Sequence, residues 1–250
     1  MPQRKIDSLD ELFPGWMMQS YQKPVTVSSS IDLLPATNAV NEDVRSYWSA
    51  KSGRSDEWII VDLEDKRDIN AIQINFYDHD TKLAGRDTVI YYQYFVEVSD
   101  DSKHWKTIID KSDSRTDCPH EYVQLPQQIS ARYVRLTNLK VPDGNFALSG
   151  FRVFGTAEGK KAPKTIQRFN LERNPEDPRE VTIHWKGTPD ATGYNIRYGI
   201  APDKLYQNYM VYSDTSLVIR SLDKNKKYYF TVDVFNEKGI SRSQIIKSIH

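Results

Sequence analysis

The chain contains a single cysteine, Cys118, which excludes an internal disulfide and a cysteine-based zinc site. No apolar run approaches the roughly 18 residues that are needed to cross a bilayer. Basic and acidic side chains balance at 34 each, so no excess of one sign favours nucleic acid or an anionic membrane. We therefore expect no nucleic-acid partner and no membrane insertion.

Catalytic signatures are also missing. None of the five histidines has H-E-x-x-H or a comparable spacing, and there is no G-x-S-x-G, Walker or dinucleotide-binding motif. Asp78-His79-Asp80 could converge on a metal only from a loop, because adjacent residues of a strand point to opposite faces. Cys118-Pro119-His120 matches no recognisable nucleophile motif. We predict that this chain is not itself an enzyme.

Aromatic residues are what the sequence has in quantity: 15 Tyr, nine Phe and five Trp among 250 residues, with only 11 Gly. This composition is typical of β-sheet proteins with aromatic cores or recognition surfaces. The length favours two domains. Residues 1–5 do not lead into the apolar segment of a signal peptide. This leaves a cytosolic protein or, as we favour, an internal or C-terminal piece of a longer protein.

Short alternating segments separated by turn signals predict an all-β chain. In the first half, one such segment places Ile72, Ile74 and Phe76 on the same face. The strand candidates there are Pro24–Ser29, Trp58–Leu63, Ile69–Phe76, Tyr91–Ser99, His104–Ile109, Glu121–Leu125, Ala131–Leu136 and Ser149–Phe154. Such a series predicts an antiparallel sandwich or jelly roll.

Residues 157–164 are small, charged and marked by Gly and Pro, which is the composition of a linker. Beyond them, the candidates are strands at Glu180–Trp185, Gly193–Tyr198, Leu217–Ile219 and Tyr228–Phe235, and a hairpin turn at Asn236–Gly239. Leu222 precedes Tyr228 by six residues, a spacing that fits a tyrosine corner, in which the phenol hydrogen-bonds back to the chain. We expect Trp185 and Tyr228 to belong to a core.

The stretch Asn38–Leu63, NAVNEDVRSYWSAKSGRSDEWIIVDL, combines a polar turn, two tryptophans and an apolar strand. With YFVEVSDDSKHW, ARYVRLTN and FALSGFRVFG following in order, it resembles the discoidin-like (coagulation factor V/VIII C-type) domain that includes many family 32 carbohydrate-binding modules. The resemblance implies a discoidin-like jelly-roll β-sandwich over residues 25–156. Trp185, Tyr194 and Tyr228 give the second half a resemblance to a fibronectin type III-like β-sandwich, over residues 165–250.

Residues 1–24 are interpreted as a lead-in. Large apolar groups around Trp16 have no core of their own there, so they should pack either on the following sandwich or on an upstream domain. The segment FPGWMMQSYQKPVTVSSS resembles the junction after the catalytic domain in some family 43 glycoside hydrolases, and the order of motifs resembles such enzymes from gut Bacteroidetes. This implies a secreted, periplasmic or cell-surface parent whose upstream catalytic domain is a partner in the same chain.

Discoidin-like modules often hold a structural calcium with an Asp, backbone carbonyls and a Ser/Thr oxygen of the opening turn and a Glu of the closing strand. The resemblance assigns Asn41, Asp43 and Ser46 to the turn and Gly150 to the Glu position. Calcium prefers six to eight oxygens with negative charge, so the loss of two carboxylates should weaken the site unless Glu42 and Asp43 compensate. The alternative is a turn held by Asx-type hydrogen bonds alone. Beyond this possible calcium, no cofactor is expected.

The galactose-type site of such modules has a His after the opening Trp, where this chain has Ser49. What remains is a set of loop residues whose types stack on sugar rings and bind vicinal hydroxyls. The candidate carbohydrate-binding residues are Tyr77, His79, Asp80, Arg86, Arg115, His120, Asn145 and Phe146. The alternatives are contacts to a neighbouring domain and solvated loop tips.

These patterns predict the non-catalytic accessory region of a secreted bacterial glycoside hydrolase, which binds polysaccharide or oligosaccharide, braces the catalytic domain, or both. The alternative is a purely structural, protein-interaction or cell-surface adhesion module without sugar binding. A brace predicts an apolar patch around Trp16–Tyr21, whereas an adhesion module predicts apolar loop tips flanked by Lys or Arg.

Overall fold

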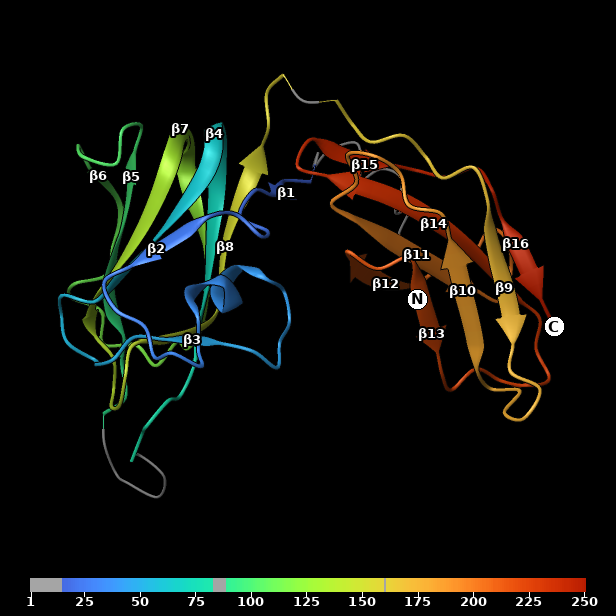
Figure 1. Ribbon diagram of the computed structural model, residues 1–250, viewed down its shortest axis with the longest axis horizontal. Coiled ribbons are helices and arrows are strands. Elements are labelled where there is room, and N and C mark those ends of the chain that lie inside the picture. Colours follow the sequence, from blue (N-terminus) through green and yellow to red (C-terminus); the bar gives the residue numbers. More distant parts are fainter. Residues whose placement is uncertain (1–14, 83–88, 160) are drawn as a thin grey trace. The chain divides into compact units, whose positions relative to one another are not determined.

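The structure is a computed structural model that describes residues 15–82, 89–159 and 161–250. The chain divides into two compact units, Met1–Glu158 and Gly159–His250, and both are built from β-strands (Figure 1). The predicted all-β class is therefore confirmed. A short 3-10 helix, η1 (Ala36–Val40), precedes the opening turn. Among the described residues, no helix is long and apolar enough to cross a membrane.

The first unit is an antiparallel sheet with the strand order β1-β8-β4-β7-β5-β6, in which β2 pairs with β4 and β3 pairs with β8. Its strands are β1 (Met17–Met18), β2 (Val25–Val27), β3 (Trp48–Ser49), β4 (Trp58–Phe76), β5 (Gln93–Ser99), β6 (Lys106–Asp110), β7 (His120–Lys140) and β8 (Ala147–Thr156). Figure 1 shows β4 and β7 side by side in the middle of this unit.

Strands β4 and β7 are longer than the sequence pattern predicted. The ladder between them shifts register between Asp62 and Arg67, and buried residues alternate along β4 on both sides of an exposed bend at 64–66. The predicted strands Trp58–Leu63 and Ile69–Phe76 are therefore two halves of one strand. The sequence pattern was interrupted at the bend because the residues there face solvent and carry no apolar alternation.

Both halves of β4 contribute to a single core. Ile72, Ile74 and Phe76 are all buried, as the alternation predicted. Burial of side chains of this size contributes about 1.5–3 kcal/mol each. At the end of β4, the Phe76 ring packs against Tyr92 at a centroid distance of 4.4 Å. This aromatic contact fixes the backbone from which the next loop begins.

The described part of the lead-in packs on the first unit. Met17 and Met18 pair with the end of β8, and the Ser20 hydroxyl accepts a hydrogen bond from the amide of Val153 at 3.0 Å. Trp16 is half-buried. Of the two alternatives, the segment from Met17 therefore contacts the following sandwich. Residues 1–14 lie outside the described part of the chain.

The second unit has two antiparallel sheets around its own core, with the orders β13-β10-β9 and β12-β11-β14-β15, and β16 pairs with β14. Its strands are β9 (Phe169–Arg173), β10 (Val181–Trp185), β11 (Gly193–Gly199), β12 (Gln207–Tyr212), β13 (Ser216–Ile219), β14 (Tyr228–Asn236), β15 (Gly239–Ser241) and β16 (Lys247–Ile249). Trp185 is buried, and Tyr228 is half-buried against the core. The phenol of Tyr228 accepts a hydrogen bond from the amide of Asp223 at 3.0 Å, as the tyrosine-corner spacing predicted.

Candidate functional site

A cleft of about 680 Å³ opens where β4 ends and where β7 begins. Its lining combines apolar, aromatic and polar side chains from four segments: Val44, Asn75, Phe76, Tyr77, Asp78, Pro119, His120, Ser149 and Arg152. Backbone hydrogen bonds join these segments. The amide of Phe76 donates to the carbonyl of Pro119 at 2.8 Å, and the amide of Tyr77 donates to the carbonyl of Ala147 at 2.9 Å. The strand ends thus fix the shape of the cleft.

Tyr77 provides a fixed aromatic surface in the cleft. Its ring stacks on Tyr47 with the centroids 3.8 Å apart and the planes at 15°, yet the residue remains 42% exposed. The Tyr47 hydroxyl lies 3.0 Å from Nδ1 of His79, whose carbonyl accepts a hydrogen bond from the amide of Asn145 at 3.0 Å. One face of Tyr77 is covered by Tyr47, and the rest of the residue is available to a ligand.

Arg152 is a largely buried cation beside the cleft. Its Nε donates to Oε1 of Glu42 at 2.6 Å, and the two side chains are only 13% and 14% exposed. Asn75 lies between Arg152 and His120: its amide group contacts the guanidinium and lies 3.3 Å from Nδ1 of His120. Gly150 leaves the space for this arrangement, because an added Cβ would lie 3.1 Å from Nη1 of Arg152.

The cleft brings together only part of the predicted set. Tyr77 and His120 line it, and His79 supports it through Tyr47. Asp80, on the same loop, is exposed and has a φ of 53°. The site residues that sequence reasoning missed are Tyr47, Asn75, Asp78, Ser149 and Arg152. Asp78 and Tyr47 had a signal, since they adjoin His79 and the opening Trp, but the others meet only through strand pairing.

Phe146 was predicted to be a sugar-binding aromatic, and the structure corrects this. Its side chain is fully buried at 0% exposure and packs edge-on against Trp48 at a centroid distance of 5.2 Å. A ring enclosed in the core cannot stack on a sugar. The sequence placed an aromatic residue near the closing strand but did not show to which side its ring points.

Two other predicted residues, Asn145 and Arg115, do not line the cleft. The side-chain amide of Asn145 donates to the carbonyl of Ala50 at 3.1 Å, so it holds the loop frame. Arg115 lies over the ring of Tyr91, with Cζ 4.7 Å from the centroid. Arg86 lies outside the residues that the structure describes.

The F5/8 type C domain is the family whose model matches the chain, over residues 24–150. The chain belongs to the F5/8 type C family. The match covers about half of the chain and leaves the second unit without an assigned family. None of the curated proteins compared with the chain is significantly similar to it.

Several solved structures are similar to this F5/8 type C unit. Chitosan-binding module 1 of a chitosanase/glucanase from Paenibacillus sp. IK-5 is 21% identical, covers 56% of this chain and 99% of that chain, and has a TM-score of 0.46. The CpGH89 CBM32-4 module produced by Clostridium perfringens, in complex with GlcNAc-α-1,4-galactose, is 20% identical, covers 56% and 94%, and has a TM-score of 0.44.

The opening turn of the F5/8 type C unit does not fit the calcium site that the resemblance implied. Oδ1 of Asn41 accepts a hydrogen bond from the amide of Asp43 at 2.9 Å, and its Nδ2 donates to Oγ of Ser46 at 2.9 Å. The carboxylate of Asp43 accepts hydrogen bonds from the backbone and side chain of Arg45, which lower its pKa. In the described residues, no three His, Cys, Asp or Glu side chains form a metal-binding group.

The closing strand contributes a cation where the calcium site of the family would need a carboxylate. With Gly150 in that position, the Arg152 guanidinium lies in the space of the missing side chain. Glu42, one of the two acids that could have compensated for the lost carboxylates, is bound to Arg152. Asx-type hydrogen bonds and this ion pair together account for the polar groups of Asn41, Glu42 and Asp43.

Proposed function

We propose that the F5/8 type C unit binds carbohydrate in the cleft beside Tyr77. The observation that carries the proposal is the exposed Tyr77 ring, held on Tyr47 among polar lining groups. Sugars present C–H faces to aromatic rings and hydroxyls to polar side chains, and binding sites combine both kinds of contact. Asp78, Ser149 and His120 supply acceptors and donors in the same cleft.

The geometry lowers the entropic cost of binding. The Tyr77 ring is already stacked on Tyr47, and the Tyr47 hydroxyl lies 3.0 Å from His79. A ligand therefore does not need to order this ring, whereas an unsupported side chain would lose about 0.5–1.5 kcal/mol on being immobilised. We expect the affinity of this single site for carbohydrate to be modest. A linked catalytic domain would benefit through a higher effective concentration near the polymer.

We further propose that the chain is the non-catalytic accessory region of a secreted bacterial glycoside hydrolase, a family 43-like enzyme of Bacteroidetes being the expected parent. Asp78 is the one carboxylate among the described residues that line the cleft. A glycosidase requires two carboxyl groups about 5–10 Å apart. This supports a binding role for the cleft, with polysaccharide as its ligand. The upstream catalytic domain of the same chain is the second proposed partner.

For the second unit, we propose a fibronectin type III-like domain that acts as a spacer or interaction module. Two facing antiparallel sheets with the orders β13-β10-β9 and β12-β11-β14-β15 support this assignment. So does the hydrogen bond from the amide of Asp223 to the phenol of Tyr228, with Leu222 buried beside it. Two exposed tyrosines are available for contacts: Tyr206 precedes the edge strand β12, and Tyr209 lies in it.

Isothermal titration of the chain with xylan, arabinan, galactan and host-glycan oligosaccharides tests the binding proposal. We expect Tyr77→Ala to weaken binding about two- to tenfold, since a lost ring stack is worth about 0.5–1.5 kcal/mol. Tyr206→Ala, which removes an exposed tyrosine from the second unit, is the matched control and should have no effect. Failure of every glycan to bind would overturn the proposal, and undiminished binding by Tyr77→Ala would exclude this cleft.

A cell-surface adhesion module is the second candidate. The observation that favours it is the exposure of two aliphatic residues in loops, Leu33 at 89% and Val89 at 78%. Single exposed aliphatic residues are common on soluble proteins, however, and need no partner. The brace alternative predicts a conspicuous apolar patch at Trp16–Tyr21, but Trp16, Met17 and Met18 are half-buried. Co-sedimentation with phosphatidylserine vesicles would favour adhesion, and glycan binding without it would favour the carbohydrate role.

A further inference from the structure

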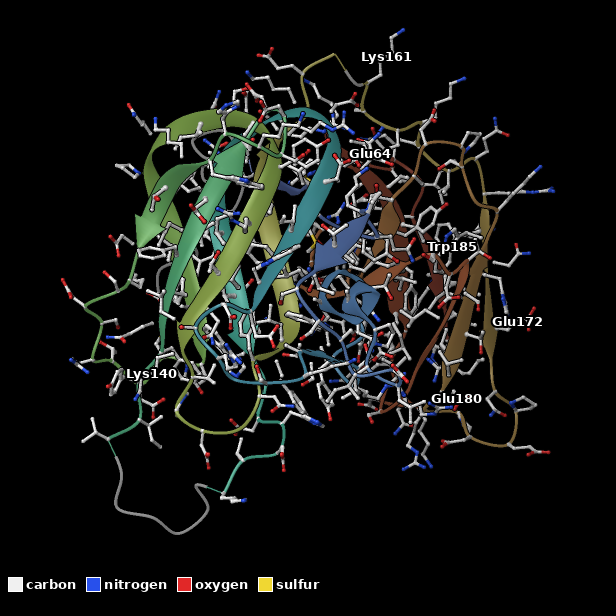
Figure 2. The ribbon with its side chains drawn as sticks, turned by 60° about the vertical axis from the view of Figure 1, so that its left-hand side comes forward. Glu64, Lys140, Lys161, Glu172, Glu180 and Trp185 are labelled. Carbon is white, nitrogen blue, oxygen red and sulfur yellow. The ribbon has the colours of Figure 1, made fainter. Side chains whose placement is uncertain are left out.

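A second group of polar and aromatic residues lies outside the cleft lining and forms the Tyr91 cluster (Tyr91, Arg115 and Lys140). Cζ of Arg115 and Nζ of Lys140 each lie 4.7 Å from the centroid of the Tyr91 ring. The three residues come from different segments: Tyr91 precedes β5, Arg115 lies between β6 and β7, and Lys140 ends β7. Figure 2 shows Lys140 at the end of the first unit that is remote from Glu64.

The cluster brings two positive charges together, and among the described residues no carboxylate forms an ion pair with either of them. By contrast, Arg135 of the same unit pairs with Glu97 at 2.8 Å. Two cations beside one ring repel each other, and an anion bound between them would offset this repulsion. The two cations lower the pKa of the Tyr91 phenol. The main cause is a hydrogen bond of the Lys140 ammonium to the phenol oxygen, and the charge of Arg115 adds to it.

The Tyr91 cluster and the cleft are connected through the same loops. The segment between β6 and β7 carries Arg115 and ends at Pro119, and both Pro119 and the first residue of β7, His120, line the cleft. The residue after Tyr91 is Tyr92, whose ring stacks on Phe76 of the cleft lining at 4.4 Å. A glycan longer than one residue that leaves the cleft along this loop would therefore approach the two cations.

We propose that the Tyr91 cluster is an anion subsite, and that the preferred glycan carries a carboxylate or sulfate group beside the residue held in the cleft. This inference rests on the proposed carbohydrate-binding function. Arg115 offers a planar fork of N–H donors that matches an oxyanion, and Lys140 offers a compact positive charge. The Tyr91 hydroxyl offers a further hydrogen bond. The cleft then supplies the stacking surface, and the cluster supplies the charge selection.

Titration with two ligands that differ only in charge tests the subsite: oligogalacturonate and its methyl ester. A sulfated galactan oligosaccharide, compared with its desulfated form, distinguishes sulfate from carboxylate as the anion. We expect the free acid or the sulfated ligand to bind at least tenfold more tightly than its neutral form at low salt. That preference should shrink as ionic strength rises, since the cations are near the surface.

The variant Arg115→Ala/Lys140→Ala should abolish the charge preference and leave binding of the neutral ligand within about twofold. Lys103→Ala/Lys106→Ala is the matched control, because it also removes two exposed positive charges. Lys103 lies in the turn between β5 and β6, and Lys106 is the first residue of β6. Equal affinity for charged and neutral ligands, or equal losses in the two double variants, would overturn the subsite. If Tyr77→Ala still weakened binding in that case, the cleft proposal would stand alone. If no ligand bound at all, both proposals would fail.

Discussion

Arg152 of the closing strand β8 and Glu42 of the opening turn form a largely buried ion pair across 110 residues of sequence, with Nε and Oε1 2.6 Å apart. The pair joins the two ends of the F5/8 type C sandwich beside the proposed binding cleft. It occupies the region in which the family resemblance had implied a calcium ion.

Loss of either partner should destabilise the first unit strongly. Arg152→Ala leaves the Glu42 carboxylate buried without a counter-ion, which costs about 3–5 kcal/mol of unfolding free energy. The double variant Glu42→Ala/Arg152→Ala should cost less than the sum of the single variants, because both remove the same interaction. Urea titration of the whole chain measures this. Arg45→Ala is the control: its pair with Asp43 is exposed and should contribute at most about 1 kcal/mol. Equal costs for Arg45→Ala and Arg152→Ala would contradict the prediction.

Calcium should not stabilise the protein. An ion that binds the folded state alone raises the midpoint of thermal unfolding, but the opening turn around Asn41 and Asp43 satisfies its own polar groups. We expect the midpoints in millimolar calcium chloride and in EDTA to agree within about 1 °C, a difference below about 0.5 kcal/mol. Differential scanning calorimetry measures this. An increase of several degrees with calcium would show that the turn rearranges to bind the ion.

Phe146 should behave as a core residue. Its ring is enclosed by Trp48 and Phe76, and removal of a buried Phe side chain costs about 3–5 kcal/mol. Phe146→Ala should therefore lower the urea midpoint substantially, and the fraction that remains folded should retain its glycan affinity. Tyr77→Ala should show the reverse, with reduced affinity and a smaller loss of stability. The predicted separation would be wrong if Phe146→Ala weakened binding while its stability remained unchanged.

Acid should remove a defined part of the stability through Asp62. Arg132 donates two hydrogen bonds to its carboxylate, at 2.7 and 2.8 Å, and this contact is the main cause of its lowered pKa. Because the pKa is lower in the folded state, the stabilisation is complete above the unfolded value of about 3.9. It is lost as the pH falls through the folded value.

The Asp62→Asn variant should be less stable than the parent at pH 7 and should approach it at about pH 2, where the carboxyl group is increasingly protonated in both states. Urea midpoints at these two pH values give the comparison. Asp56→Asn is the control, because its ion pair with Arg54 is exposed on both sides. A gap between Asp62→Asn and the parent that did not narrow in acid would contradict the linkage to this carboxyl group.

Strands that alternate between core and solvent could be predicted from the sequence, whereas strands without a buried face could not. In β4, Ile72, Ile74 and Phe76 are buried and alternate with half-buried neighbours, as the sequence pattern indicated. β12 was missed because its residues are mostly exposed and its apolar side chains follow no period of two. The continuity of β4 through its exposed bend was missed for a related reason.

The candidate site was predictable only where its residues are neighbours in sequence. Tyr77 and His79 share one loop and were identified together. Asn75 and Arg152 meet because β4 pairs with β8, with Asn75 opposite Gly150, and no local pattern indicates that register. Phe146 shows the opposite failure, since an aromatic residue near a loop has the same sequence signature whether its ring faces a ligand or the core.

The sequence by itself determined the all-β class and, through its ordered motifs, the F5/8 type C family of the first unit. Alternation and turn chemistry are local, so they can be read without knowing the fold. The tertiary structure decided which aromatic is exposed and which cation lies beside the opening turn. Folding brought Arg152 to Glu42 and Tyr47 to Tyr77. Such contacts depend on the packing of distant segments, and only the folded chain specifies them.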